Sequence, residues 1–526
     1  MHKLSNLLKH HSNSVVVQSQ VSVPLCPPAV LPSQADFYRY RKQRGVNLGS
    51  WFVLERWITD MPFRFANGPA QSDLDVAQGS RAQEVLEHHW DTWITEQDWA
   101  WIAARGINTV RIPIGYYHIC GADPSVLQGT DFANFEHVFR GAWARITNAL
   151  ATAHRYGIGV LFDLHAAPGK QNADSHSGTS SSNPSFFTNS YNMPHTTHIL
   201  STFLSHLTAF ANSHAPPLSN LVGIELLNEP QPQSHNSALQ KWYLDTFREM
   251  RTIDPGVPLY IGDAWMTDQY ADFLGGAAVH FAVLDHHLYR CFTPGDASTP
   301  VSQHTHALRD PNEWAPQMFS RVSQKLEGAG CALVVAEWSG ALNPGSLQCV
   351  DDENRAKREY VEAQIQLYDR YCAGWFFWTY KKEHRGDRGW SLRDAVDAGN
   401  FPSSVGLVAR TSVIYDTDHS ARRDAARDLA LGQHSSYWLQ YPGSYEHWRF
   451  SDGFLKGWED AYMFFSALGP APHSAPTPEL GFKGPWAKRR VQEHARDKGQ
   501  NNLWEYEHGF SQGAAAARED FERVHC

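Results

Sequence analysis

The sequence predicts an α/β fold, a (β/α)8 TIM barrel with a C-terminal helical extension. Between about residues 40 and 410, short apolar or β-branched runs alternate with helical patterns. That alternation indicates βαβ units and a parallel sheet. There are eight such runs, which suits a closed barrel better than an open, doubly wound sheet. The length of 526 residues fits as well, because α/β barrels often run long as one domain.

The eight candidate strands follow one another along the chain, each flanked by polar or turn-forming residues. They comprise residues 45–48, 109–112, 159–165, 221–228, 258–262, 281–285, 332–336 and 374–378. Helical patterns fill the intervals. Two of them, residues 89–106 and 137–157, end at Gly106 and Gly157, as a helix with a glycine cap does.

Two long polar segments interrupt this alternation. Residues 169–185 follow the third strand, and residues 293–302 follow the sixth. Barrel enzymes build their sites from the loops that follow the carboxyl ends of strands, so we expect these segments to border a site. The alternative is that both are solvated loops with no role.

The two ends of the chain have other patterns. Residues 1–36 are polar, then proline-rich, and predict a disordered tail. Residues 37–410 form the predicted catalytic domain. Residues 411–526 predict a mostly helical extension with helices over 452–468 and 484–498. We expect it to pack on the barrel, since Trp458 and Phe464 are costly to expose, rather than to form a separate domain.

Composition excludes several classes of protein. A formal net charge of −10 argues against nucleic-acid binding. Seven cysteines without C-x-x-C spacing argue against a zinc site or a dense disulfide framework. No apolar run resembles a secretory leader or a membrane span, and no N-x-S/T acceptor occurs. We therefore expect a cytoplasmic protein with reduced thiols, with unconventional secretion left open.

Two carboxylates are the candidate catalytic pair. Glu229 ends the string GIELLNEP after the fourth strand, and Glu337 lies in LVVAEWSG at the end of the seventh. In a barrel the ends of these two strands face each other across the mouth. Glycoside hydrolysis needs two carboxyl groups that flank the scissile bond, at about 5–5.5 Å in a retaining enzyme. A surface salt bridge is the alternative role for either residue alone.

Six further polar or aromatic residues fall at strand ends. They are Arg111, His165, Asn228, His287, Tyr289 and Trp378. The Asn228 amide can bind a sugar 2-hydroxyl, and Arg111 inside an apolar strand needs a partner such as Glu337. Each residue alone fits a structural role, but their recurrence at successive strand ends favours a substrate-binding site. Adjacent strand residues face opposite ways, so His286 and His287 do not predict a metal; no cofactor is implied.

These strings resemble glycoside hydrolase family 5, and the resemblance covers about residues 40–410. It implies that Glu229 is the acid/base and Glu337 the nucleophile. The opening RGVNLGSWFVLERWI and the stretch DLHAAPGKQN are similar to fungal exo-β-1,3-glucanases, especially their intracellular members. The resemblance implies a hydrolase that releases glucose from β-1,3-glucan, a process tied to glucan catabolism and cell wall organization. After His165 the sequence departs from the secreted enzymes.

Two alternatives to this activity stay open from the sequence. One is a β-glucosidase that acts on a lipid glucoside, namely a steryl glucoside or glucosylceramide. A wide apolar cleft beside the site would be its signature. The other is a carbohydrate-binding pseudoenzyme, which the presence of both Glu229 and Glu337 argues against.

Overall fold

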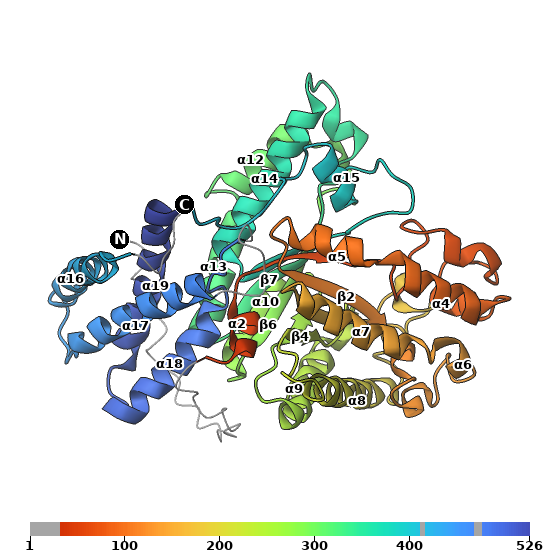
Figure 1. Ribbon diagram of the computed structural model, residues 1–526, viewed down its shortest axis with the longest axis horizontal. Coiled ribbons are helices and arrows are strands. Elements are labelled where there is room, and N and C mark those ends of the chain that lie inside the picture. Colours follow the sequence, from red (N-terminus) through yellow and green to blue (C-terminus); the bar gives the residue numbers. More distant parts are fainter. Residues whose placement is uncertain (1–31, 411–415, 468–475) are drawn as a thin grey trace.

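The computed structural model describes residues 32–410, 416–467 and 476–526, and a closed barrel of eight parallel strands forms its centre (Figure 1). The strands pair in sequence order, and β8 closes on β1. Their bounds are β1 Gln43–Asn47, β2 Thr109–Gly115, β3 Gly159–Ala166, β4 Leu221–Glu225, β5 Leu259–Gly262, β6 Ala282–Leu288, β7 Ala332–Trp338 and β8 Gly374–Phe377. The predicted fold class is confirmed.

All eight predicted strands are present, with bounds that differ at their carboxyl ends. β2, β6 and β7 run further than predicted, to Gly115, Leu288 and Trp338. β4 stops at Glu225, before the predicted end at Asn228. In β6 and β7 the extension carries the chain through His287 and Glu337, so these side chains are positioned by ladder hydrogen bonds rather than by loops.

Helices surround the barrel and connect its strands. Those within the barrel are α2 Gln34–Tyr40, α3 Asp73–Ala77, α4 Ala82–Trp93, α5 Glu96–Ala103, α6 Glu136–Phe139, α7 Ala142–Arg155, α8 Asn192–Asn212, α9 Asn236–Ile253, α10 Thr267–Gly276, α11 Pro294–Ser298, α12 Val301–Arg309, α13 Trp314–Gly328, α14 Glu353–Tyr371 and α15 Leu392–Asp397. Among the described residues, none of the helices has the length and apolar character that crossing a bilayer requires.

Two predicted helices are each divided in the structure. The pattern over residues 89–106 becomes α4 and α5, because Thr95 begins a new helix. Its backbone N–H and its hydroxyl both donate to Asp98 Oδ2 at 2.9 Å, a capping box. The pattern over residues 137–157 becomes α6 and α7, which ends at Arg155 before Gly157, whose φ is 70°.

Two predicted segments differ in detail from the structure. The expected tail over residues 1–36 lies mostly outside the described residues, and its last residues belong to α2, which Ser33 caps. The predicted loop 293–302 contains the short helix α11, capped by Thr293. The loop 169–185 has only the short 3-10 turn Ser175–Ser177.

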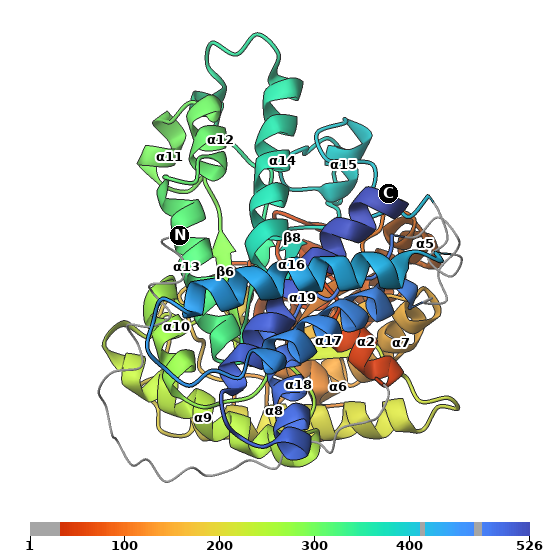
Figure 2. The same cartoon turned by 90° about the vertical axis from the view of Figure 1, so that its left-hand side faces the viewer.

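The C-terminal extension is a bundle of four helices, α16 His419–Trp438, α17 His447–Ser466, α18 Lys483–Lys498 and α19 Leu503–His525. α17 and α18 correspond to the two predicted helices, although Leu468, the predicted end of the first, lies outside the described residues. Figure 2 shows the bundle against one end of the barrel.

The bundle covers the amino ends of the strands. Phe281, Ala332 and Ala373, which begin or precede β6, β7 and β8, share a buried apolar cluster with α17, α18 and α19. In that cluster Tyr40 lies 4.7 Å from Trp486, measured between ring centroids. The carboxyl ends of the strands, where the predicted site residues lie, are therefore at the opposite end of the barrel.

Candidate active site

The structure brings all eight predicted site residues to the carboxyl end of the barrel. Six of them line one cavity of about 1120 Å³: His165, Glu229, His287, Tyr289, Glu337 and Trp378. The other two, Arg111 and Asn228, are fully buried, and from inside the barrel Arg111 contacts Glu337 and Asn228 contacts His165.

Arg111 is the centre of the buried charge network. Its guanidinium contacts Glu225 at 2.7 Å, Asp163 at 3.0 Å and Glu337 at 2.8 Å, and none of these side chains is more than 6% exposed. It also donates to Asn228 Oδ1 at 2.9 Å. Burial alone would lower the pKa of Arg111, but the three carboxylates raise it well above its ordinary value. Arg111 is therefore a permanent cation beneath Glu337.

Glu337 is held through both of its oxygens. Arg111 Nη1 donates to Oε1 at 2.8 Å, and the Tyr289 hydroxyl donates to Oε2 at 2.8 Å. Burial and the adjacent carboxylate raise the pKa of Tyr289 well above its ordinary value, so its hydroxyl keeps the proton that it donates. The two contacts fix the orientation of the carboxylate, with one oxygen bound to Arg111 and the other to Tyr289.

Glu229 follows β4 in a strained backbone conformation. Its φ is 44°, in the left-handed region that L-residues rarely adopt. Its Oε1 accepts a hydrogen bond from His287 Nδ1 at 2.8 Å. One carboxylate oxygen of Glu229, one of Glu337 and a ring nitrogen of His287 all lie within 4.8 Å of one another. This spacing belongs to the retaining arrangement and not to the wider inverting one.

His287 lies between carboxylates on both sides of its ring. Nε2 contacts Asp285 Oδ2 at 3.0 Å, while Nδ1 contacts Glu229 and lies 3.5 Å from Glu337 Oε2. Although burial lowers it, the pKa of His287 is raised well above its ordinary value by Glu337 and Asp285. The pKa of Glu229 is lowered in turn, because the hydrogen bond and the charge of His287 outweigh burial. In the unliganded site the shared proton therefore lies on His287.

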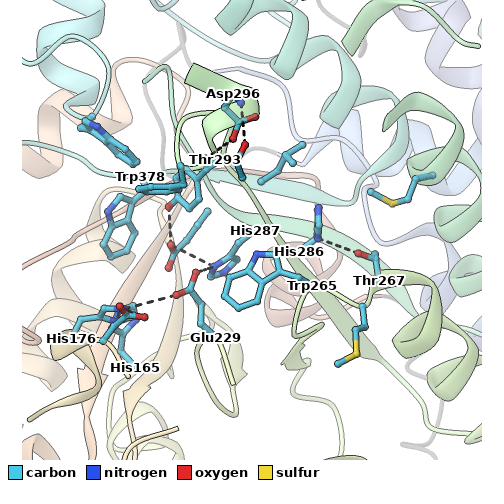
Figure 3. Close-up of a pocket in the computed structure, with 18 of the residues that line it drawn as sticks. His165, His176, Glu229, Trp265, Thr267, His286, His287, Thr293, Asp296 and Trp378 are labelled. Carbon is cyan, nitrogen blue, oxygen red and sulfur yellow. Dashed lines mark hydrogen bonds and ion pairs between the residues drawn. The ribbon is translucent and has the colours of Figure 1, made fainter. Parts of the chain in front are cut away.

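His165 and Trp378 form a wall beside the two carboxylates. Their rings stack with an interplanar angle of 5° and centroids 5.8 Å apart. His165 Nδ1 contacts Asp163 Oδ2 at 2.6 Å, and burial lowers the pKa of His165 well below its ordinary value. Figure 3 shows His165 and His176 on one side of Glu229 and Trp265 on the other. The cavity thus has a polar half and a second half beyond Glu229.

The second half of the cavity is apolar and exposed. Trp314 and Trp265 line it with 61% and 49% of their surface exposed, and Phe292, 71% exposed, extends the apolar lining from Tyr289, against which its ring packs with centroids 5.5 Å apart. Met266 and Met318 lie on the same lining. Large apolar side chains exposed together in a cavity are typical of a binding surface.

Several site residues were not predicted. Asp163, Glu225 and Asp285 are carboxylates inside apolar strands, and the burial argument that we applied to Arg111 would have identified them. Glu55 and Trp57 come from the loop after β1, where Trp57 Nε1 donates to Glu55 at 2.7 Å. Burial raises the pKa of Glu55 to about 7. Trp390, from the loop after β8, has no sequence signal that separates it from core tryptophans.

The loop 169–185 has a structural and a site role. The buried Lys170 ammonium donates to the carbonyl oxygens of Thr179 at 2.8 Å and Ser181 at 2.5 Å, which draws the loop together. Asn172 Nδ2 then donates to the Glu229 carbonyl at 3.0 Å. His176, at the tip of the loop, lines the cavity. The reading of this loop as solvated and without a role is therefore wrong.

Three groups among the described residues place histidine and carboxylate atoms within 4.8 Å of one another, which is close enough to hold a metal ion. Two share His287, and the third, His434, His447 and Glu505, lies in the C-terminal bundle. Hydrogen bonds and ion pairs account for the contacts in all three. His286 points away from His287 and contacts Asp263 at 2.7 Å.

Comparisons with known proteins agree with this geometry. The family model described as cellulase (glycosyl hydrolase family 5) matches residues 76–384. A second, described as the glucan 1,3-beta-glucosidase 3 C-terminal domain, matches residues 419–524. The chain is 30% identical to glucan 1,3-beta-glucosidase 3 of Schizosaccharomyces pombe, over 91% of this chain and 96% of that protein.

Other relatives are similar over part or nearly all of the chain. A probable glucan 1,3-beta-glucosidase A of Aspergillus fumigatus is 30% identical, over 69% of this chain and 88% of its own. An uncharacterized glycosyl hydrolase of Saccharomyces cerevisiae is 28% identical over 94% of both chains. Among solved structures, a rutinosidase from Aspergillus niger shares the fold, with a TM-score of 0.53 and 19% identity over 69% of this chain and 98% of its own.

Proposed function

This chain belongs to the cellulase family, glycoside hydrolase family 5, and on that premise we propose that it releases glucose from the non-reducing ends of β-1,3-glucan by double displacement. It is a glycosidase by family membership. The observation that carries the mechanism is the spacing of Glu229 and Glu337, whose oxygens lie within 4.8 Å. The substrate is supported by relatives that are named glucan 1,3-beta-glucosidases.

In the first step Glu337 attacks the anomeric carbon. Arg111 and Tyr289 hold both of its oxygens, so the carboxylate is oriented before the substrate arrives. Glu229 is ionised in the unliganded site, so a proton must first reach it; Glu229 then gives that proton to the glycosidic oxygen as the bond to the leaving group breaks. Asn228 lies beside this pair, with Oδ1 fixed by Arg111 and Nδ2 3.5 Å from His165 Nε2, so the second N–H of its amide is left to donate to the sugar 2-hydroxyl.

In the second step the roles of the proton carriers reverse. The charge of Glu337 is consumed in the glycosyl ester, so His287 keeps Asp285 and Glu229 as its anionic partners. Because His287 lowers the pKa of Glu229, Glu229 is a ready base at this stage. It takes a proton from water, which attacks the ester and releases glucose with its β configuration.

A time course of products from laminarin tests the substrate and the mode of action. We expect glucose alone from the earliest time point, as the β anomer by NMR, and none with Glu337→Gln. A ladder of oligosaccharides would contradict exo action, and α-glucose would contradict retention. We also propose a cytoplasmic location, as expected from the sequence, which fractionation of cells that express the full chain would check.

The apolar half of the cavity favours a second candidate substrate, a β-glucoside of an apolar alcohol such as a lipid glucoside. Phe292, Trp314 and Trp265 could cover such an aglycone, since burying one aromatic side chain stabilises a complex by about 1.5–3 kcal/mol. A glucan would use the same faces as sugar platforms, so the two substrates must be separated by measurement.

Values of kcat/KM for octyl β-glucoside and methyl β-glucoside separate the two candidate substrates. If the apolar half holds the aglycone, kcat/KM for the octyl compound is at least tenfold higher, and Phe292→Ser or Trp314→Ser removes that advantage. Trp448→Ser is the matched control, because Trp448 is 43% exposed but lies on α17. Equal kcat/KM values for both glucosides would contradict this candidate and leave the glucan proposal standing.

A further inference from the structure

His176 occupies a position that the mechanism above does not use. It lies in the loop after β3, lines the cavity, and its side chain is only 17% exposed. Its Nδ1 lies 3.1 Å from His165 Nε2, and its Nε2 lies 3.9 Å from Glu229 Oε2. Figure 3 shows Glu229 between His176 and His287.

The hydrogen-bond chain fixes which ring nitrogen of His176 carries a proton. Asp163 accepts the Nδ1 proton of His165 at 2.6 Å, so the Nε2 of His165 is an acceptor. The 3.1 Å contact between the rings must then use the Nδ1 proton of His176. The Nε2 atom of His176 is left to titrate, and it is the atom that faces Glu229.

The two oxygens of Glu229 are not equivalent. Oε1 accepts the hydrogen bond from His287, so Oε2 is the oxygen that can deliver a proton into the cavity. The 3.9 Å between Oε2 and His176 Nε2 is too long for a direct hydrogen bond. It does admit one water oxygen at about 2.8 Å from each atom.

We propose that His176 is a positioning residue that shares the acid proton with Glu229, through one water between Nε2 and Oε2. The proposal rests on the assignment of Glu229 as acid/base. The proton moves from His176 Nε2 to the water, and the water gives one of its own to Glu229 Oε2, so no proton is gained or lost. The imidazolium becomes neutral, and the carboxylate becomes the carboxylic acid that the leaving oxygen needs.

The charges around His176 favour its protonated form. Asp174 lies 3.8 Å from Nε2, and Glu55 faces it from the loop after β1. Burial lowers the pKa of His176, but Asp174, Glu55 and Glu229 together raise it to about 9.

Other cations and a neutral imidazole ring lie around the pair formed by His176 and Glu229. Lys170 lies near Asp174, and His165 with its partner Asp163 lies behind the ring. His287 is the cation on the far side of Glu229. Two sites that share one proton titrate as a pair, so the pair keeps its proton to higher pH than Glu229 alone would.

The test compares pH profiles of kcat/KM for two glucosides. Phenyl β-glucoside needs an acid for its leaving group, whereas 2,4-dinitrophenyl β-glucoside does not. With the phenyl compound, we expect His176→Gln to move the alkaline limb down by at least one pH unit, and Asp174→Asn to move it less. With the dinitrophenyl compound, we expect little change in kcat/KM above neutral pH. His198→Gln, an exposed histidine on α8, is the matched control.

An alkaline limb that stays in place, or an equal loss for both glucosides at every pH, would overturn the proposal, because a packing role predicts either. A pH titration that follows the imidazole ¹⁵N signals of the full chain tests the proposal without any measurement of turnover. We expect the His176 midpoint above the ordinary value of about 6.5, and lower in Glu229→Gln. A midpoint that Glu229→Gln leaves unchanged would also overturn it. If His176 and Glu229 titrate as a coupled pair but the chain hydrolyses no glucoside, the proposed function is contradicted, whereas the sharing of a proton between the two residues still holds.

Discussion

Arg111 is the residue on which the charge balance of the site depends. It is a fully buried cation that contacts Asp163, Glu225 and Glu337. Taking charges out of water costs several kcal/mol per ion, and only their mutual contacts offset that cost. The same guanidinium thus stabilises the barrel interior and orients Glu337, the proposed nucleophile.

We expect Arg111→Met to lower the free energy of unfolding by about 3–5 kcal/mol, because it leaves three carboxylates buried without their cation. Denaturant unfolding of the variant and the wild type measures this. Arg155→Met is the control, since the pair of Arg155 with Glu96 is at least 57% exposed and contributes about 0–1 kcal/mol. Equal losses in the two variants would contradict the central role of Arg111.

The assignment of roles to Glu229 and Glu337 makes a separate prediction. Glu229→Ala loses hydrolysis of substrates with poor leaving groups but keeps the first step on 2,4-dinitrophenyl β-glucoside. Added azide then attacks the glycosyl ester at Glu337, and we expect β-glucosyl azide by NMR. An α-glucosyl azide would show that the two roles are reversed.

At the residue scale, the sequence analysis identified polar residues at the ends of apolar strands. It missed the carboxylates Asp163, Glu225 and Asp285 inside the strands, and the residues that reach the site from distant loops. Arg111, Asn228 and Glu229 were identifiable because a polar group inside or at the end of an apolar strand needs a reason. Glu55 and Trp390 reach the cavity from loops after β1 and β8, and only closure of the barrel brings these loops together.

At the scale of elements, the strands were the most predictable part of the fold. Every strand residue is buried except Leu288 at the end of β6, so the apolar runs stand out from the amphipathic helices on either side. Helix boundaries were less predictable, because the capping box of Thr95 interrupts a pattern whose apolar period continues. The sequence predicted that the C-terminal helices pack on the barrel but not at which end of it or with which partners, since the long-range contact between α17 and α19 has no local signature.

The contact between α17 and α19 depends on glycines. A Cβ atom at Gly457 would lie 2.1 Å from the carbonyl oxygen of Phe510, and one at Gly513 would lie 2.0 Å from that of Phe454. The backbones must therefore separate if either glycine gains a side chain. We expect Gly457→Ala to destabilise the chain by about 1–3 kcal/mol, as overpacking does.

Gly432→Ala on α16 is the matched control for this prediction. A Cβ atom there meets nothing within 4 Å, and alanine favours a helix over glycine by about 0.5–1 kcal/mol. Thermal unfolding should thus show opposite shifts for the two substitutions. A Gly457→Ala variant as stable as Gly432→Ala would mean that α17 and α19 are not as closely packed as the structure shows.

Glu505 on α19 links three elements of the bundle. His434 of α16 contacts its Oε2 at 3.0 Å, and His447 of α17 contacts the same atom at 2.8 Å. Burial alone would raise the pKa of Glu505, but these hydrogen bonds, with one from the Glu446 backbone, lower it below its ordinary value.

A lowered pKa in the folded state stabilises the fold above the unfolded value of about 4.3, and this contribution is lost as the pH falls through the folded pKa. We therefore expect wild type to be more stable than Glu505→Gln at pH 7, with a difference that shrinks steadily below pH about 4.3. Urea unfolding at several pH values measures the difference. A difference that stays constant down to pH 3 would contradict this account.

At the scale of the whole molecule, chemistry and support lie at opposite ends of one barrel. The proposed catalytic carboxylates, the cavity and its loops are at the carboxyl ends of the strands. The bundle α16–α19 and the helix α2 share an apolar cluster with the amino ends. The residue before β1, Lys42, donates its backbone N–H to Glu479 between α17 and α18, which ties the bundle to the first strand.

This arrangement predicts that the barrel does not fold well without the bundle, although every site residue lies before residue 410. A chain that ends at residue 410 would expose Tyr40, Phe281 and Phe376, each at most 5% exposed in the full chain. Such surface drives aggregation. We expect the truncated chain to be insoluble when expressed alone, and residues 411–526 supplied as a second chain to restore solubility and turnover. A soluble truncated chain with the kcat/KM and the unfolding temperature of the full chain would show instead that the bundle is an independent domain.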